Sequence, residues 1–172
     1  MNPLSPIVRH HLSWSKIPQT PNYELKRNAE TTGILSRPSY WSPRFLAETR
    51  EGRWVFRRQG FLGTGVEITD ALSEEPIATF QSSCGGGGRV TFLDGQGFWL
   101  KYRGWWRPVW TVTTDDGQLV LEVRTREKTV EVPAGTAVSS IRVSLLITFT
   151  WSRVLQADED ESAASIAAMT AA

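Results

Sequence analysis

The 172-residue chain has one cysteine, two histidines and no long hydrophobic run. The single cysteine, Cys84, excludes an internal disulfide and a metal site made of several cysteines. The adjacent histidines His10 and His11 lack the further ligands that a metal site needs. Recognisable arrangements for nucleophilic or paired-carboxylate catalysis are also missing. We therefore expect a non-catalytic protein without a metal or other cofactor.

The sequence also has little that resembles a membrane span or a secretory signal. Its longest apolar stretch is far shorter than the roughly 20 residues that cross a bilayer, and Arg153 interrupts it. Residues 1–21 contain four prolines and no apolar core of the kind that a signal peptide has. We expect residues 1–20 to be a flexible lead-in, and the protein to be cytoplasmic.

Neither sign of charge dominates, since 19 Lys and Arg stand against 18 Asp and Glu, for a net charge of +1. Four of the acids form the run DEDE at residues 158–161, which leaves the preceding residues with a charge of +5. A nucleic-acid-binding surface usually has a larger and more clustered positive excess, so we expect no nucleic-acid partner. Four consecutive acids also lack the spaced ligands and glycine turn of a calcium loop. We interpret residues 158–172 as an acidic and alanine-rich tail, with DEDE solvated. Its part ESAASIAAMTAA has high helix propensity but can bury little, so we expect it to fray.

Short apolar or alternating segments separated by turn residues are abundant, and this pattern is typical of an all-β domain. Three of the breaks, REGRW, LDGQGF and DDGQLV, place an acid before a glycine, which suits the positive φ of a tight hairpin turn. Strands are predicted at residues 23–27, 34–36, 44–49, 54–58, 66–69, 77–81, 89–93, 98–103, 109–113, 119–124 and 129–132. We expect an antiparallel meander that curls around a core, which also removes exposed strand edges.

The stretch SSIRVSLLITFTWSRVLQA, residues 139–157, fits two kinds of secondary structure. Apolar residues from Ile141 to Trp151 alternate with mostly polar ones, and β-branched residues are frequent, which favours a strand. From Leu145 to Leu155 the apolar residues also surround a helical wheel, which is typical of a fully buried helix. The residues alone leave both structures open.

The order of hairpins and aromatic residues resembles that of a known superfamily. NYELKR is followed by RFLAETREGRWVFRRQGFLGTGVEI, by PIATFQSSCGGGGRVTFLDGQGFWLKYRGWWRPVWTV, by DGQLVLEVR and by an apolar segment that ends in acids. Over residues 20–160 this is similar to the tubby C-terminal-like superfamily, which includes LURP-one-related proteins, phospholipid scramblases and small bacterial members. The resemblance implies a closed antiparallel β-barrel of about twelve strands, at residues 21–157, around a buried hydrophobic C-terminal helix at residues 145–156.

The glycine run CGGGGRV, residues 84–90, offers bare backbone amides that can cradle an anion. A phosphate-binding loop also needs a spaced lysine and a following helix, whereas a strand is expected to follow here. We interpret the run as a flexible connection between two strands.

The stretch RGWWRPVW interleaves arginine with tryptophan. Indole rings favour a membrane interface and guanidinium groups pair with phosphate, although the same residues also stack on an ordinary barrel rim. We expect Trp106 and Trp110 to belong to the core. Together with FRRQGF, the stretch supplies five candidate residues for binding lipid headgroups: Arg57, Arg58, Arg103, Trp105 and Arg107.

These residues and the resemblance favour a module that binds anionic phospholipid headgroups peripherally, at the inner face of the membrane. Members of the superfamily bind phosphoinositides through basic residues, but none of their motifs transfers here residue by residue. The candidates therefore come from charge alone. The alternative is a barrel that binds another protein or serves as a scaffold, with no lipid ligand; the aromatic surplus without site chemistry favours it.

Overall fold

The structure is a computed structural model that describes residues 10–38, 42, 44–60, 64–83, 87–104 and 107–170, with side chains up to residue 159. Over these residues the chain forms a closed antiparallel barrel of twelve strands and a single helix, which confirms the predicted fold class. In chain order the elements are β1 (His10–Lys16), β2 (Tyr23–Arg27), β3 (Glu30–Ser36), β4 (Arg44–Thr49), β5 (Arg53–Gln59), β6 (Gly65–Asp70), β7 (Pro76–Ser82), β8 (Gly88–Phe92), β9 (Gly97–Arg103), β10 (Val109–Thr114), β11 (Leu119–Arg124), β12 (Thr129–Val132) and α1 (Ser140–Thr170).

The strands expected from the sequence correspond to β2 through β12. Each pairs with its neighbours in the chain, as a meander requires. At the two DGQ turns, Gly95 and Gly117 have φ values of 88° and 87°, a conformation that glycine adopts without steric cost. At the first of these turns, Asp94 Oδ1 also accepts a hydrogen bond from the backbone N–H of Gln96 at 3.1 Å. The two DGQ breaks are therefore hairpin turns with a positive-φ glycine, as predicted. REGRW also joins two paired strands, β4 and β5, but its Gly52 does not have a positive φ.

Strand β1 corrects the expectation that residues 1–20 precede the barrel. It pairs with both β2 and β12 and so closes the sheet. Its burial alternates along the chain, with Leu12 and Trp14 facing the core. The segment resembled a lead-in because prolines flank it and most of its other residues are polar. Without β1, the edges of β2 and β12 would be left unpaired.

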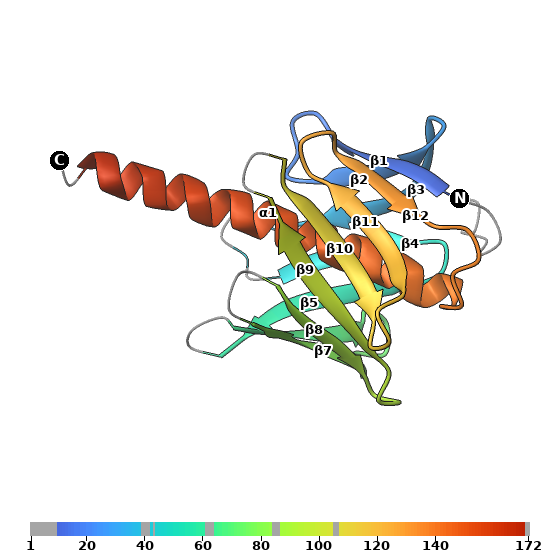
Figure 1. Ribbon diagram of the computed structural model, residues 1–172. Helices are drawn as coiled ribbons and strands as arrows, with labels where there is room; N and C mark the ends of the chain where they lie inside the picture. The colour runs from blue at the N-terminus through green and yellow to red at the C-terminus, as the bar shows by residue number, and fades with distance from the viewer. Residues whose placement is uncertain are drawn as a thin grey trace.

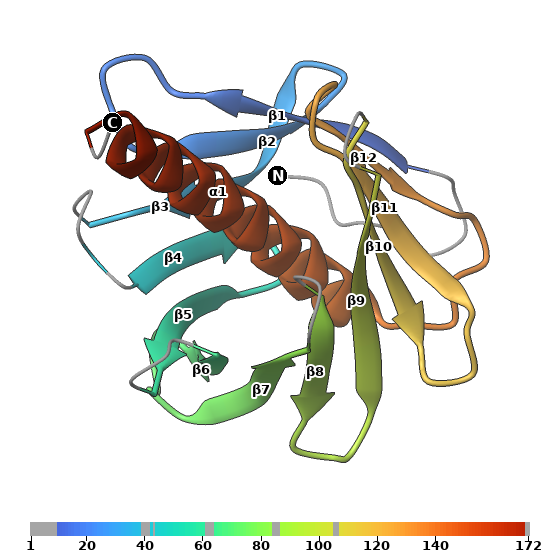
Figure 2. The same ribbon diagram turned by 60° about the vertical axis from the view of Figure 1, so that its left-hand side comes forward.

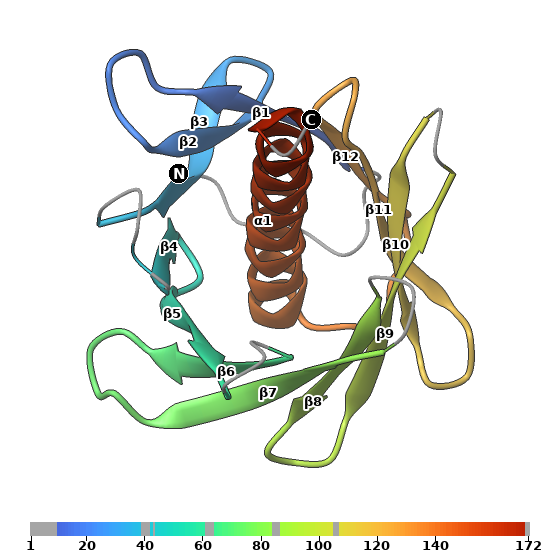
Figure 3. The same cartoon turned by 90° about the vertical axis from the view of Figure 1, so that its left-hand side faces the viewer.

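Helix α1 runs through the middle of the barrel, with the strands arranged around it (Figure 3). All side chains from residue 143 to residue 152 are buried. Two of the four hydroxyl groups among them bond to the helix itself: Thr148 donates to the carbonyl oxygens of Ser144 and Leu145 at 3.0 and 2.9 Å, and Ser152 donates to that of Phe149 at 2.6 Å. Ser144 donates to Glu51 Oε2 at 3.0 Å, and Thr150 Oγ1 is buried without a hydrogen-bond partner among the described residues. Hydrogen bonds thus satisfy three of the four hydroxyls, and a segment with strand-like alternation can be a buried helix. The structure thus selects the helix from the two alternatives.

The helix is longer at both ends than the expected residues 145–156. It begins at Ser140, where the guanidinium group of Arg142 binds Asp94 and Gln96 in the β8–β9 turn. Its C-terminal part leaves the barrel and projects beyond the strands (Figure 1). The prediction of a frayed tail is therefore wrong for residues 161–170, which continue the helix as their helix propensity favours.

Aromatic side chains set how α1 packs in the barrel. Phe149 meets Phe56 of β5 and Phe80 of β7, with ring centroids 5.4 and 5.1 Å apart. On another side of the helix, Trp151 stacks on Trp14 of β1 at 5.3 Å with an interplanar angle of 10°. Such ring pairs prefer particular geometries and contribute beyond the area that they bury. They therefore stabilise one orientation of α1 relative to the strands.

Two glycines of the run CGGGGRV have a steric role. A Cβ atom on Gly87 would lie 2.4 Å from the carbonyl oxygen of Leu100, and one on Gly88 would lie 2.3 Å from that of Gln81. Both distances are far below van der Waals contact, so only glycine fits. We expected the glycine run to be a flexible connection, but Gly87 and Gly88 are buried and sterically confined. Cys84 lies outside the described residues.

The barrel has two distinct ends. We call the end where Arg142 meets the β8–β9 turn the entry end, and the end where α1 emerges beside Arg37 the exit end. Figure 2 shows the helix crossing from one end to the other. Because the strands form a meander, successive connections alternate between the ends. The exit end therefore holds the β1–β2, β3–β4, β5–β6, β7–β8, β9–β10 and β11–β12 connections.

Candidate functional site

Four of the five predicted headgroup-binding residues lie at the exit end. Arg57 and Arg58 are near the C-terminal end of β5, Arg103 ends β9, and Arg107 lies two residues before the start of β10. Both β5 and β9 run toward the exit end, so the meander brings these two separate sequence stretches to the same rim. The predicted Trp105 lies outside the described residues, as does Trp106. Trp110 is buried in the core, as predicted.

The four arginines differ in their surroundings. Arg57, Arg103 and Arg107 are exposed, and no acidic side chain among the described residues forms an ion pair with them. Arg58 is half-buried and alternates onto the inner side of β5, the side of Trp54 and Phe56. We therefore keep Arg57, Arg103 and Arg107 as candidate anion-binding residues and assign Arg58 to the packing of the barrel mouth.

Other basic residues near this rim were not predicted as site residues. Lys101 is exposed on β9, two residues before Arg103. Lys16 ends β1, and Arg37 directly follows β3. Nothing in their local sequence marks these residues, because Lys16 and Arg37 flank proline-containing loops and Lys101 lies in an ordinary strand. Counting alternate connections of the meander would have placed them at the same end as the predicted arginines.

The connections at the two ends carry opposite charge. In the described parts of the exit-end connections, the charged residues are Arg37, Arg107, Arg126, Lys128 and one acid, Glu127. In those of the entry-end connections they are Glu51, Glu74, Glu75, Asp94, Asp115, Asp116 and one base, Arg50. The connections are thus mostly basic at the exit end and mostly acidic at the entry end, while Asp158 and Glu159 of α1 add two acids to the exit end.

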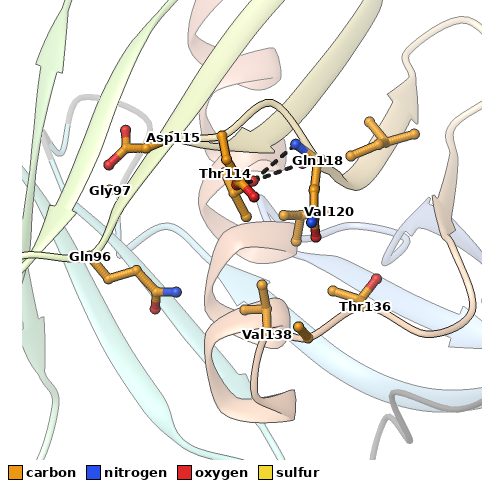
Figure 4. A pocket seen from close by; sticks show the side chains of 11 residues that line it. Gln96, Gly97, Thr114, Asp115, Gln118, Val120, Thr136 and Val138 are labelled. Carbon is orange, nitrogen blue, oxygen red and sulfur yellow. Dashed lines mark hydrogen bonds between the residues drawn. The ribbon is translucent and has the colours of Figure 1, made fainter.

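The entry end holds a cavity of about 410 Å³ between the two DGQ turns and the segment that leads into α1 (Figure 4). Its polar groups already have partners. The carboxylate of Asp115 accepts hydrogen bonds from Arg89 Nε and Nη2 at 3.1 and 2.6 Å, and this contact lowers the pKa of Asp115. Thr114 donates to Asp116 and accepts from the backbone N–H of Gln118 at 3.0 Å. These bonds stabilise the turn, so we assign the cavity a structural role.

A second cavity, of about 270 Å³, lies at the exit end beside the emerging helix. Lys16, Tyr23 and Arg37 line it from the barrel, and Asp158 and Glu159 line it from α1. Burial raises the pKa of the Tyr23 hydroxyl, and the nearby carboxylates of Glu159 and Asp158 raise it further. The hydroxyl therefore remains a hydrogen-bond donor at neutral pH.

The described residues contain no group of three or more His, Cys, Asp or Glu side chains that could hold a metal ion. Within the same part of the chain, no helix combines the length and apolar character that crossing a bilayer requires. The chain matches no family model, no curated protein and no solved structure.

Proposed function

We propose that the protein is a non-catalytic β-barrel module of the cytoplasm that binds anionic phospholipid headgroups through its exit end, peripherally at the inner membrane face. The observation that carries this proposal is that Arg57, Arg103 and Arg107 lie at the same rim, exposed and without an ion pair to an acidic side chain among the described residues. Guanidinium groups form charge-assisted hydrogen bonds with phosphate oxygens.

The expected binding is weak and sensitive to salt. Each basic residue near an anionic membrane surface contributes about 1 kcal/mol, and screening reduces this within a Debye length. Lys101, close to Arg103 on β9, adds to the positive potential. The acidic connections of the entry end favour an orientation with the exit end toward the membrane, whereas Asp158 and Glu159 of α1, which projects in the same direction, oppose the attraction.

We also propose that the chain is a member of the tubby C-terminal-like superfamily. A closed antiparallel barrel around a C-terminal helix is the architecture that the sequence resemblance implies, and it supports this assignment. Binding of anionic headgroups through basic residues agrees with the properties of that superfamily. Fold alone does not define function, so the charge arrangement carries the functional proposal.

Vesicle co-sedimentation tests the proposed function. Phosphatidylcholine vesicles, with and without 30% phosphatidylglycerol, are compared at low and high salt. We expect pelleting that depends on the anionic lipid and falls with salt. The variant R103E/R107E is expected to weaken it more than ten-fold, because about 1 kcal/mol is lost for each arginine and repulsion is added.

The matched control is R50E/R53E, which makes the same charge change at the entry end. The proposal is overturned if pelleting is equal on neutral and anionic vesicles at low salt, or if the two variants lose the same amount. Absence of pelleting under every condition would also overturn it, and would favour the alternative, a barrel that binds another protein.

A further inference from the structure

The exit-end cavity beside α1 contains a basic site that one of the protein's own carboxylates occupies. Arg37, which leads out of β3, forms an ion pair with Glu159 of the emerging helix. The two residues are far apart in sequence, and their contact joins the barrel to the part of α1 that leaves it. The cavity of about 270 Å³ surrounds this pair.

The guanidinium group of Arg37 is held firmly in place. Its side chain is 13% exposed. Its Nε donates to the carbonyl oxygen of Ser42 at 3.2 Å, and the group lies over the ring of Phe45, 5.2 Å from the centroid. Nη1 is the donor to Glu159. A guanidinium group fixed in this way presents its N–H donors to an oxyanion in a defined direction.

Two further donors line the same cavity. Lys16 is exposed at the end of β1. Tyr23 begins β2, and its ring centroid lies 6.3 Å from that of Trp151 in a T-shaped arrangement. Arg37, Lys16 and Tyr23 thus supply donors from three separate elements. The two positive charges are balanced by Asp158 and Glu159, so the cavity as folded is close to neutral.

We infer that this cavity is a binding site for a phosphate monoester, and that the carboxylate of Glu159 is an internal competitor for it. A carboxylate and a phosphate accept the same hydrogen bonds from a guanidinium group. A monoester has three terminal oxygens and nearly two negative charges, which match donors from three elements and two cations. The group can belong to a lipid headgroup or to free phosphate. This inference extends the proposed function at the same end of the barrel and does not depend on it.

The test compares D158N/E159Q with a matched control, E74Q/E75Q. Both variants remove two acidic charges, but Glu74 and Glu75 are exposed at the entry end. Affinity for inorganic phosphate is measured by titration calorimetry. Affinity for vesicles is measured with phosphatidylcholine containing 10% phosphatidic acid, whose headgroup is a phosphate monoester. We expect D158N/E159Q to bind inorganic phosphate at least three-fold more tightly than E74Q/E75Q, since it alone removes the competing carboxylate.

A third variant identifies the donor side. Lys16→Gln, in the D158N/E159Q background, is expected to reverse most of the gain in phosphate affinity. Lys16 is exposed, so the substitution is expected to leave folding intact, and the thermal midpoint of the variant is measured as a check. Equal phosphate affinities of D158N/E159Q and E74Q/E75Q would overturn the inference. If D158N/E159Q binds inorganic phosphate more tightly than its control while neither wild type nor D158N/E159Q pellets with anionic vesicles, the site stands for free phosphate and the proposed function fails. If wild type pellets with anionic vesicles but D158N/E159Q behaves like its control in both assays, the inference fails and the proposed function stands.

Discussion

Gly88 shows how strongly a single residue constrains this barrel. A Cβ atom there would meet the carbonyl oxygen of Gln81 at 2.3 Å and the ring of Phe80 at 2.5 Å. The carbonyl oxygen belongs to strand backbone and cannot move aside. Phe80 is fully buried against Phe149, so its ring is also confined. Close packing at this point leaves no room for even one methyl group.

Gly88→Ala is therefore expected to destabilise the protein by about 1–3 kcal/mol, the usual cost of overpacking a core. Thermal unfolding followed by circular dichroism measures the change. Gly65→Ala is the control, because a Cβ atom there makes only ordinary contacts of 3.7 Å or more; its effect is expected within about 0.5 kcal/mol. Equal shifts in the two variants would contradict the steric explanation.

At the residue scale, part of the candidate site could be predicted from the sequence. Arg57, Arg103 and Arg107 were identified because local composition combines arginine with aromatic residues. Arg37 and Lys16 were not, because their role comes from their position beside residue 159 of α1, more than a hundred residues later in the chain. Local patterns carry no information about such long-range neighbours.

Strand β1 is the element on which closure of the barrel depends. Its Trp14 is 2% exposed and stacks on Trp151 of α1. Trp14→Ala is expected to destabilise the protein by about 3–5 kcal/mol, because it leaves a large cavity between the closing strand and the helix. Chemical unfolding measures the loss. Trp99→Ala is the control, since Trp99 is 37% exposed on the outer face of β9 and its loss costs much less. A comparable loss in the two variants would mean that β1 contributes little to the core.

Turns at the entry end make stability depend on pH. Hydrogen bonds from Arg142 and from the backbone of Gln96 lower the pKa of Asp94, and those from Arg89 lower the pKa of Asp115. A carboxylate with a lowered folded-state pKa stabilises the fold above its ordinary value near 3.8. This contribution is lost as the pH falls through the lower, folded value.

We therefore expect the thermal midpoint to fall as the pH is lowered from about 4 to 2. The variant D94N/D115N is expected to have a lower midpoint at neutral pH and a flatter dependence below pH 4, because the titrating groups are gone. Circular dichroism melts across this range measure both effects. A D94N/D115N curve parallel to that of wild type below pH 4 would show that other groups cause the acid sensitivity.

At the element scale, the sequence predicted most of the fold. Eleven strands were recognised because alternation of apolar residues and acid–glycine turns are local signals. β1 was missed because prolines on both sides obscured its alternation. The residues of α1 fitted a strand equally well; the resemblance pointed to a helix, and the surrounding barrel explains why, since it buries every side of the segment.

At the scale of the whole molecule, the meander places alternate connections of the chain at opposite ends of the barrel. Every second connection lies at the same end, so a charge bias between odd and even connections becomes a charge difference across the barrel. The sequence shows only a net charge of +1. The difference between the mostly basic and the mostly acidic connections becomes visible only when they are sorted by the topology.

The enclosed helix also has a consequence for how the protein is made. The segment that fills the barrel follows every described strand in the chain, and β1 must find β12 at the opposite end of the sheet sequence. During synthesis the strands therefore leave the ribosome before α1, the helix that fills the core of the barrel, has been made. Pairing across such a separation is also slow. The barrel can therefore close around a filled core only after α1 has been translated.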